Sequence, residues 1–267
     1  MSLTWGAMIP KTQTEPVSRV KLGVISDIHA NLPALKAVIR DARRHGVDRI
    51  LCLGDIVGYG PQPAECVRAI RQVAATTVLG NHDAWAVRPV AWSRLAVSPT
   101  VIPGLKHARA ELSSEEQAWL RQLPLVAHTE GMALVHGSFH RPALWPYLDD
   151  ASAASASLSR QPSQVSFFGH THEAGYWQEG RNQFITPALN RETRLRRHRR
   201  YAVNPGSVGN PRTPAHRADP RAQYLLFDTI TLGVTFRRVA YDVTACVSAL
   251  RTADLPEEMI SRIELGY

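Results

Sequence analysis

The sequence predicts a mixed α/β fold, and two features of its 267 residues carry that prediction. Short apolar runs in the first third alternate with polar loops and stretches of helical spacing, which is typical of parallel strands joined by crossover helices. After Phe168 the apolar runs follow one another across short turns, as in antiparallel sheets. The residues themselves therefore predict a parallel half followed by an antiparallel half, without an internal repeat.

The predicted parallel half consists of two strand–helix units and a third strand. Its strands are expected at 20–25, 49–53 and 76–79. A helix is predicted over 34–45, because its apolar residues recur at intervals of three and four, with Asn31 as N-cap and Gly46 as its stop. A second helix is expected over 63–73.

The pattern from 84 to 123 is helical, with a capping box at Ser113–Glu116. A hairpin is expected across Glu130-Gly131, and the Ser/Ala-rich stretch Ala151–Ser159 is interpreted as an exposed helix or loop. A last helix is predicted over 243–251. Further strands are expected at 125–127, 132–135, 165–168, 174–177, 183–185, 201–203, 224–227 and 234–239.

Composition indicates an ordinary soluble protein, with 44% apolar and 20% charged residues. No run of about 18 apolar residues predicts a membrane span, and residues 1–16 lack the pattern of a secretion signal. We expect a poorly ordered leader at 1–19 and one domain at 20–267. Cys52, Cys66 and Cys246 are odd in number and widely spaced, which favours buried free thiols in a reducing compartment, the cytoplasm.

The formal net charge is +8, and the stretch Arg191–Arg200 holds six arginines against one glutamate. Two interpretations stay open: a solvated loop or hairpin end, or a patch for phosphate-rich partners such as nucleic acid. No aromatic residue is interleaved with these arginines for base stacking, which argues against a dedicated single-strand binder.

Polar residues that can hold a metal follow the apolar runs at several strand ends. They are Asp27, His29, Asp55, Asn81, His82, His136, His170 and His172. Imidazoles with carboxylates and an amide oxygen suit Mn, Fe, Zn, Ni or Co rather than a thiolate-bound metal. The set exceeds the needs of one ion, whereas two ions roughly 3.5–4 Å apart that share a carboxylate would use it fully.

The spacing within two of these clusters predicts which side chains converge. In Asp27-Ile28-His29 the two polar residues are separated by one, which places both on one face of an extended segment. His170 and His172 have the same spacing. We therefore expect each pair to point together from one strand end.

In this order the motifs resemble the calcineurin-like metallophosphoesterase superfamily. The matching motifs are Asp27-x-His29, Gly54-Asp55, Gly80-Asn81-His82-Asp83, His136 and Gly169-His170-x-His172. Two stretches, Gly54–Pro61 and Asn204–Gly209, are similar to the compact bacterial phosphodiesterases related to the retromer subunit Vps29. The resemblance spans about Lys21 to Arg221 and implies a four-layer αββα sandwich, in which two mixed β-sheets are flanked by helices.

The resemblance also implies a two-metal hydrolase with Asp55 as the bridging ligand. One metal would be held by Asp27, His29, Asp55 and His172, and the other by Asp55, Asn81, His136 and His170. Manganese is the expected ion, with Fe, Ni, Zn and Co as alternatives. A metal-bridging hydroxide would attack phosphorus, and the expected substrate is a phosphoester, foremost a phosphodiester, in a small molecule or nucleotide.

His82 is the candidate that protonates the leaving group or clamps a phosphate oxygen. Many family members carry an aspartate three residues after the bridging one, and here that position is Gly58. Both roles of His82 therefore stay open. Residues that follow the ligands, and could shape the substrate cleft, are Tyr59, Ser138, His140 and Arg141.

A second function is a protein-binding scaffold of the Vps29 kind with weak or no catalysis. Scaffold relatives lose metal ligands, whereas every expected ligand position is filled here, so the sequence favours the enzyme. No membrane partner is expected, and the sequence predicts no particular oligomer.

Overall fold

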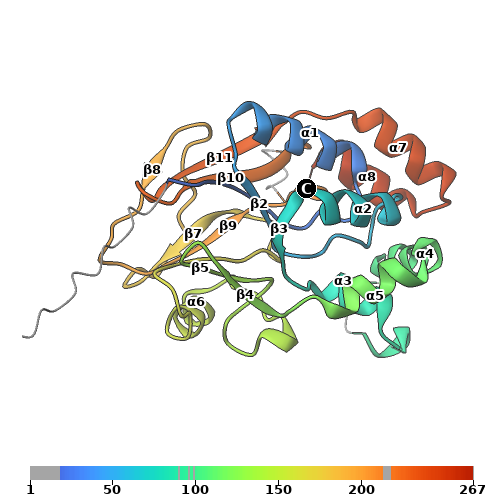
Figure 1. Ribbon diagram of the computed structural model, residues 1–267. Coiled ribbons are helices and arrows are strands. Elements are labelled where there is room, and N and C mark those ends of the chain that lie inside the picture. Colours follow the sequence, from blue (N-terminus) through green and yellow to red (C-terminus); the bar gives the residue numbers. More distant parts are fainter. Residues whose placement is uncertain (1–18, 90, 96, 99, 213–217, 267) are drawn as a thin grey trace, which may run out of the picture.

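The computed structural model describes residues 19–89, 91–95, 97–98, 100–212 and 218–266. Two β-sheets lie face to face with helices outside them (Figure 1). One sheet has six strands in the order β3-β2-β1-β10-β11-β8, and the other has five in the order β4-β5-β6-β9-β7. Both sheets mix parallel and antiparallel pairs, so the mixed α/β four-layer fold is confirmed.

The strands of the six-stranded sheet are β1 (Lys21–Ile25), β2 (Arg49–Cys52), β3 (Ala74–Thr77), β8 (Thr193–Arg194), β10 (Ala222–Asp228) and β11 (Gly233–Val239). Those of the five-stranded sheet are β4 (Val126–Thr129), β5 (Met132–Val135), β6 (Val165–Phe167), β7 (Ala174–Gln178) and β9 (Tyr201–Pro205). The helices are α1 (Leu32–Arg44), α2 (Pro63–Val73), α3 (Asn81–Val87), α4 (Val101–Glu111), α5 (Ser114–Gln122), α6 (Ala151–Leu158), α7 (Val243–Thr252) and α8 (Glu257–Leu265).

The expected division into a parallel and an antiparallel half of the chain is wrong. Strands β1, β2 and β3 are parallel as predicted, but β10 and β11 return to the same sheet, with β10 antiparallel to β1. In the other sheet β9 is parallel to β6 rather than antiparallel. Strand order depends on which faces pack together, and local patterns of apolar residues do not encode it.

Separate groups of buried apolar residues hold the four layers together, one between the two sheets and others between each sheet and its helices. Residues such as Leu22, Leu134 and Phe167 fill the space between the two sheets, where the rings of Phe167 and Phe227 meet edge to face at 5.3 Å. Helices α1 and α2 cover the outer face of the six-stranded sheet through residues such as Leu35 and Val67, and α6 covers the outer face of the five-stranded one.

Several local predictions are confirmed and several are wrong. Asn31 caps α1 by accepting from the Ala34 amide, and the capping box at Ser113 and Glu116 opens α5. The stretch at 84–123 is divided among three helices and a short 3₁₀ turn, and α8 was not predicted. Residues 183–185 form only an isolated bridge, through Ile185 to Tyr176. Helix α6 is half-buried, because Leu158 packs in the core.

The predicted leader lies outside the described residues except for Arg19, so the division at 19/20 stays a prediction. All three cysteines are buried and free, as expected. Among the described residues, no helix combines the length and apolar character needed to span a membrane.

Candidate metal centre and substrate cleft

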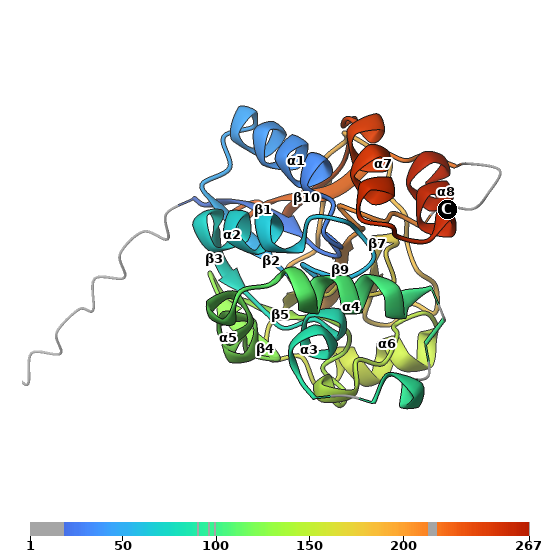
Figure 2. The same ribbon diagram turned by 90° about the vertical axis from the view of Figure 1, so that its right-hand side faces the viewer.

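The predicted ligands gather at one edge of the two-sheet sandwich. Asp27 and Asp55 follow β1 and β2 of the six-stranded sheet, and His136 and His170 follow β5 and β6 of the other sheet. Asn81 is the first residue of α3. The carboxyl ends of parallel strands lie at the same edge, and in Figure 2 the loops there lie between α7–α8 and α3–α4.

These side chains converge because the backbone turns tightly and not because it is extended. Asp27, His29, Asp55, His170 and His172 all have φ between +47° and +68°. The inference of a shared face from an extended segment is therefore wrong, although Asp27 and His29 do come together. Left-handed conformations of non-glycine residues store strain and cluster at functional sites.

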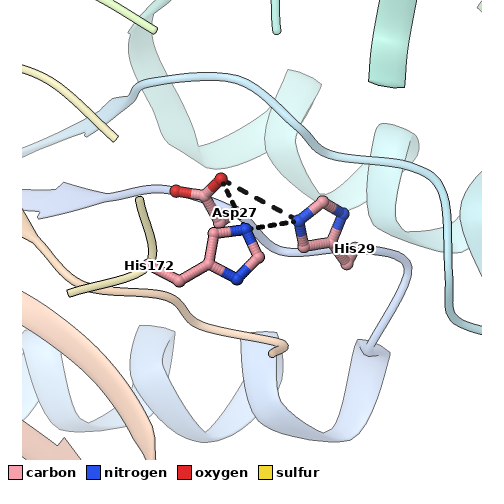
Figure 3. A group of neighbouring side chains, drawn as sticks. All are labelled: Asp27, His29 and His172. Carbon is pink, nitrogen blue, oxygen red and sulfur yellow. Dashed lines mark hydrogen bonds and ion pairs between the residues drawn. The ribbon is translucent and has the colours of Figure 1, made fainter. Parts of the chain in front are cut away.

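The first group of donors is Asp27, His29 and His172 (Figure 3). Nε2 of His172 lies 3.2 Å from Oδ1 of Asp27 and 3.1 Å from Nε2 of His29. Nε2 of His29 lies 3.8 Å from the same aspartate oxygen. Three donors from two distant loops therefore face one point.

The second group is Asp55, His136 and His170. Nε2 of His136 lies 3.3 Å from Oδ2 of Asp55, and the rings of His136 and His170 are 5.0 Å apart. His170 and His172 thus belong to different groups, as the family resemblance implies, whereas their spacing alone predicted that they point together. Asp55 also belongs to a third group with His29 and His82, which makes it the carboxylate common to two of the three groups.

Backbone carbonyls hold three of the imidazoles in one orientation. The Nδ1 atoms of His29, His136 and His172 lie 3.3, 2.7 and 2.6 Å from carbonyl oxygens of Val57, Leu53 and Asn210. A carbonyl can only accept, so each Nδ1 carries a proton and each Nε2 faces the centre, where it can bind a metal once it is unprotonated. Imidazole ligands of metals have this arrangement.

The centre fits divalent cations. Asp27 Oδ1, Asn81 Oδ1 and His136 Nε2 are buried and form no hydrogen bond with the described residues. The Nε2 lone pairs of His29 and His172 face each other at 3.1 Å, an arrangement that a cation between them would stabilise. Unpaired buried polar atoms are costly unless something satisfies them, and this donor set of nitrogen and oxygen suits first-row divalent metals.

The electrostatics of the centre keep its donors ready to bind metal. Burial raises the pKa of Asp27, but attraction to His172 outweighs it and leaves the pKa below its usual value. Burial lowers the pKa of His29 and brings that of His170 to about 3, so both imidazoles stay neutral. In His136 the carboxylates outweigh burial and raise the pKa to about 9, so a metal would displace a proton there.

His82 lies over this centre without a carboxylate partner. Its Nδ1 is buried and without a hydrogen bond in the described part of the chain. A Cβ at Gly58 would come within 2.3 Å of that nitrogen, so only glycine fits there in this arrangement. Asp83 accepts instead from the amides of Ile56, Val57 and Gly80, and therefore braces the loop rather than His82.

The loop that contains Asn204 and Ser207 forms hydrogen bonds with the backbone of the segments that carry the metal-binding candidates. Ser207 Oγ donates to the carbonyl of Asp27 at 2.7 Å, and the Asn204 amide donates to the carbonyl of Gly169 at 2.9 Å. Both residues therefore hold ligand-bearing backbone in place.

A cavity of about 570 Å³, which we call the cleft, opens beside Asn81, His82 and His170. Of the four residues predicted to shape it, Tyr59 lines it, whereas Ser138, His140 and Arg141 do not. Ser138 Oγ accepts from the amide of His140, which is an ordinary turn contact. Sequence reasoning missed the lining residues Trp85, Trp145, Tyr147, Arg212 and Arg262, which come from four separate segments.

The run Arg191–Arg200 lies at the opposite end of the six-stranded sheet. Arg194 pairs with Gly233, which pairs with Asp228, which pairs with Lys21 at the start of β1. The ligands follow the other end of β1, and Figure 1 shows β8 far from α3. These arginines therefore do not line the cleft.

Fold and donor set together define a phosphoesterase of the metal-dependent class. The chain belongs to the calcineurin-like phosphoesterase superfamily, because the model of that superfamily's domain matches residues 20–231. This confirms the resemblance found in the motifs. The C-terminal helices α7 and α8 lie outside the matched residues.

Similar proteins agree with this assignment. A metallophosphoesterase from Sphaerobacter thermophilus is 35% identical with a TM-score of 0.82, and the match covers 94% of this chain and all of that one. Uncharacterized protein MJ0912 of Methanocaldococcus jannaschii is 31% identical over 92% of this chain and 98% of its own. A symmetrical bis(5'-nucleosyl)-tetraphosphatase of Thioalkalivibrio sulfidiphilus is 30% identical over 69% of each chain.

Proposed function

We propose that this protein hydrolyses phosphoesters, foremost phosphodiesters, at a centre of two divalent cations. Asp27, His29, Asp55 and His172 would hold one cation. Asp55, Asn81, His136 and His170 would hold the other. The observation that carries the proposal is the clustering of buried donors in overlapping groups linked through His29 and Asp55, together with the buried atoms Asp27 Oδ1, Asn81 Oδ1 and His136 Nε2, which lack a hydrogen bond within the described residues. Manganese is the expected ion, with Fe, Ni, Zn and Co as alternatives.

When bound, two such cations supply an activated water nucleophile and neutralise the phosphate oxygens. The chain itself orients the substrate and excludes water from the centre. His82 lines the cleft next to Asn81 and is placed to donate a hydrogen bond, either to a phosphate oxygen or to the leaving oxygen. A histidine can donate a hydrogen bond to a phosphate oxygen without a carboxylate bound to its other ring nitrogen. Nδ1 of His82 has no hydrogen bond to any described residue, which favours this role.

The name of the Thioalkalivibrio relative supports a nucleotide substrate, since that protein is a bis(5'-nucleosyl)-tetraphosphatase. The chain spans about half of some other relatives with that name. The cleft has the volume of a small-molecule site, which is consistent with such a substrate.

The test is a screen of mono-, di- and cyclic phosphates with added Mn²⁺, starting with bis(4-nitrophenyl) phosphate. We expect hydrolysis that requires the metal and disappears with chelator. Metal analysis should show a loss in His170→Ala but not in His198→Ala, which changes an exposed histidine outside the site. Equal metal content in both variants would contradict the proposed ligands. Metal binding without turnover of any phosphoester would favour the scaffold.

A further inference from the structure

One wall of the cleft is cationic. Arg212 follows the loop after β9, and Arg262 comes from α8, yet both line the cleft next to Tyr59. Within the described part of the chain the Arg262 side chain has one partner, Glu258, which is one helical turn away and about half exposed. Arg212 forms no ion pair with any described residue. The two guanidinium groups therefore present positive charge that the surrounding protein leaves mostly unneutralised.

Helix α8 is fixed against the site rather than resting loosely on the surface. Met259 and Ile263 face the loops of His29 and Gly209 across a space of only about 10 Å³. The helix also packs on α7 through a core of its own that includes Ile260 and Leu250. In Figure 2, α8 lies across the strand-end loops from α3. A segment outside the matched family domain thus contributes a positioned cation to the cleft.

Another part of the cleft lining is aromatic. The rings of Trp85 and Trp145 meet edge to face at 6.4 Å, and Tyr147 stacks on His170 at 4.0 Å. Trp145 Nε1 donates to the carbonyl of Leu79, which fixes the indole. All three rings line the cleft, and Tyr147 is 44% exposed. Partly exposed aromatic faces beside a charged site favour planar groups.

We infer that the cleft binds a nucleotide with at least two phosphoryl groups, its base against Trp85 and Trp145 and its further phosphate against Arg212 and Arg262. This inference rests on the proposed function and names its substrate class. The metal centre needs only one phosphoester, so the two arginines are available for a second anionic group. Guanidinium forks match phosphate geometry, and such charge-assisted bonds are about twice as strong as neutral ones.

The test measures binding by calorimetry to the Mn²⁺-loaded protein. The ligands are α,β-methylene-ADP, whose P–C–P bridge resists hydrolysis, inorganic tripolyphosphate and adenosine. We expect the nucleotide analogue to bind more tightly than either partial ligand. Arg262→Gln should weaken binding of the analogue about tenfold or more, and Arg262→Lys should restore part of it. Arg251→Gln is the matched control, because its side chain lies on the same helical pair, is 61% exposed and does not line the cleft.

The aromatic wall is tested separately. Trp85→Leu should reduce the advantage of the analogue over tripolyphosphate, whereas Trp119→Leu, which is also partly buried but outside the cleft, should keep it. Melting temperatures of all variants distinguish lost binding from lost folding. Binding of the analogue that is equal in Arg262→Gln and Arg251→Gln would overturn the inference.

The two proposals can fail independently. If the wild-type protein cleaves bis(4-nitrophenyl) phosphate but Arg262→Gln binds the analogue normally, the phosphoesterase stands and the nucleotide site is wrong. If nothing is cleaved but Arg262 still governs binding of the analogue, the site stands and the hydrolase is wrong.

Discussion

The floor and the rim of the candidate site are built differently. The floor consists of the carboxylates and imidazoles directly after β1, β2, β5 and β6, each at most 7% exposed. The rim consists of partly exposed aromatic residues and arginines from α3, the loop before α6, the loop after β9 and α8. Backbone hydrogen bonds hold the floor, whereas side-chain packing positions the rim.

This difference leads us to expect that the floor governs the hydrolysis itself and that the rim governs which substrates are preferred. The floor is preorganised by turns that tolerate little change, so its variants should affect every substrate through the metal. In the proposed site the rim would contact only the parts of a substrate beyond the reacting phosphate, so its variants should change substrate preference.

The largest effect is expected from Asp55→Asn. Asp55 belongs to two donor groups and also accepts from the amide of His82 at 2.8 Å, so a neutral side chain should weaken both of the proposed cation sites. Metal content and hydrolysis should fall together, with activity reduced by more than about 10²-fold for all substrates. Asp254→Asn is the control, since Asp254 is exposed and far from the donors in the chain. Full metal content in Asp55→Asn would remove the distinction between floor and rim.

His82 lies between the floor and the rim. Its substitution tests whether it donates a hydrogen bond to a phosphate oxygen or a proton to the leaving group. We expect His82→Ala to lower kcat about 10²-fold for both good and poor leaving groups, because it removes one hydrogen-bond donor to a phosphate oxygen. The measurement is kcat for 4-nitrophenyl and alkyl diesters of one nucleotide. A loss confined to the alkyl ester would instead identify His82 as the proton donor.

The missing side chain of Gly58 allows the ring of His82 to pack directly against the backbone at residue 58. Gly58→Ala combines left-handed strain at φ +89° with a Cβ contact of 2.3 Å to His82, whereas Gly46→Ala has φ +65° and open space. We expect about 1 kcal/mol of destabilisation in Gly46→Ala from strain alone. Gly58→Ala should lose more, with activity impaired as His82 shifts. Denaturant unfolding and hydrolysis of both variants check this, and equal behaviour would contradict the close packing.

The smallest effect concerns the support behind the floor. Asp41 of α1 accepts from Tyr224 of β10 and Arg237 of β11. Burial raises its pKa, but these hydrogen bonds outweigh it and lower the pKa below 3.8. The stabilisation is therefore present above pH 3.8 and is lost as the pH falls through the lower folded-state pKa.

Asp41→Asn should reduce the free energy of unfolding by about 1–2 kcal/mol at pH 6, and the gap to wild type should shrink toward pH 3. Urea unfolding across this range measures it. A gap that does not change with pH would show that the charge of Asp41 contributes nothing.

The sequence by itself determined much of the floor. Its first donors follow apolar runs, and the carboxyl ends of parallel strands must meet at one edge, so local patterns were enough to gather Asp27, Asp55 and Asn81. The order of the motifs was enough to indicate the superfamily. Helix caps at Asn31 and Ser113 were also readable, because a cap depends only on residues within one turn.

Only the tertiary structure decided that left-handed turns direct His170 and His172 into different groups, a division that the family resemblance implied but that their spacing did not. It also decided that β10 returns beside β1 and that Arg262 reaches the cleft from α8. These features depend on contacts between residues far apart in the chain. Such contacts follow from the packing of whole layers, which no local pattern of residue types specifies.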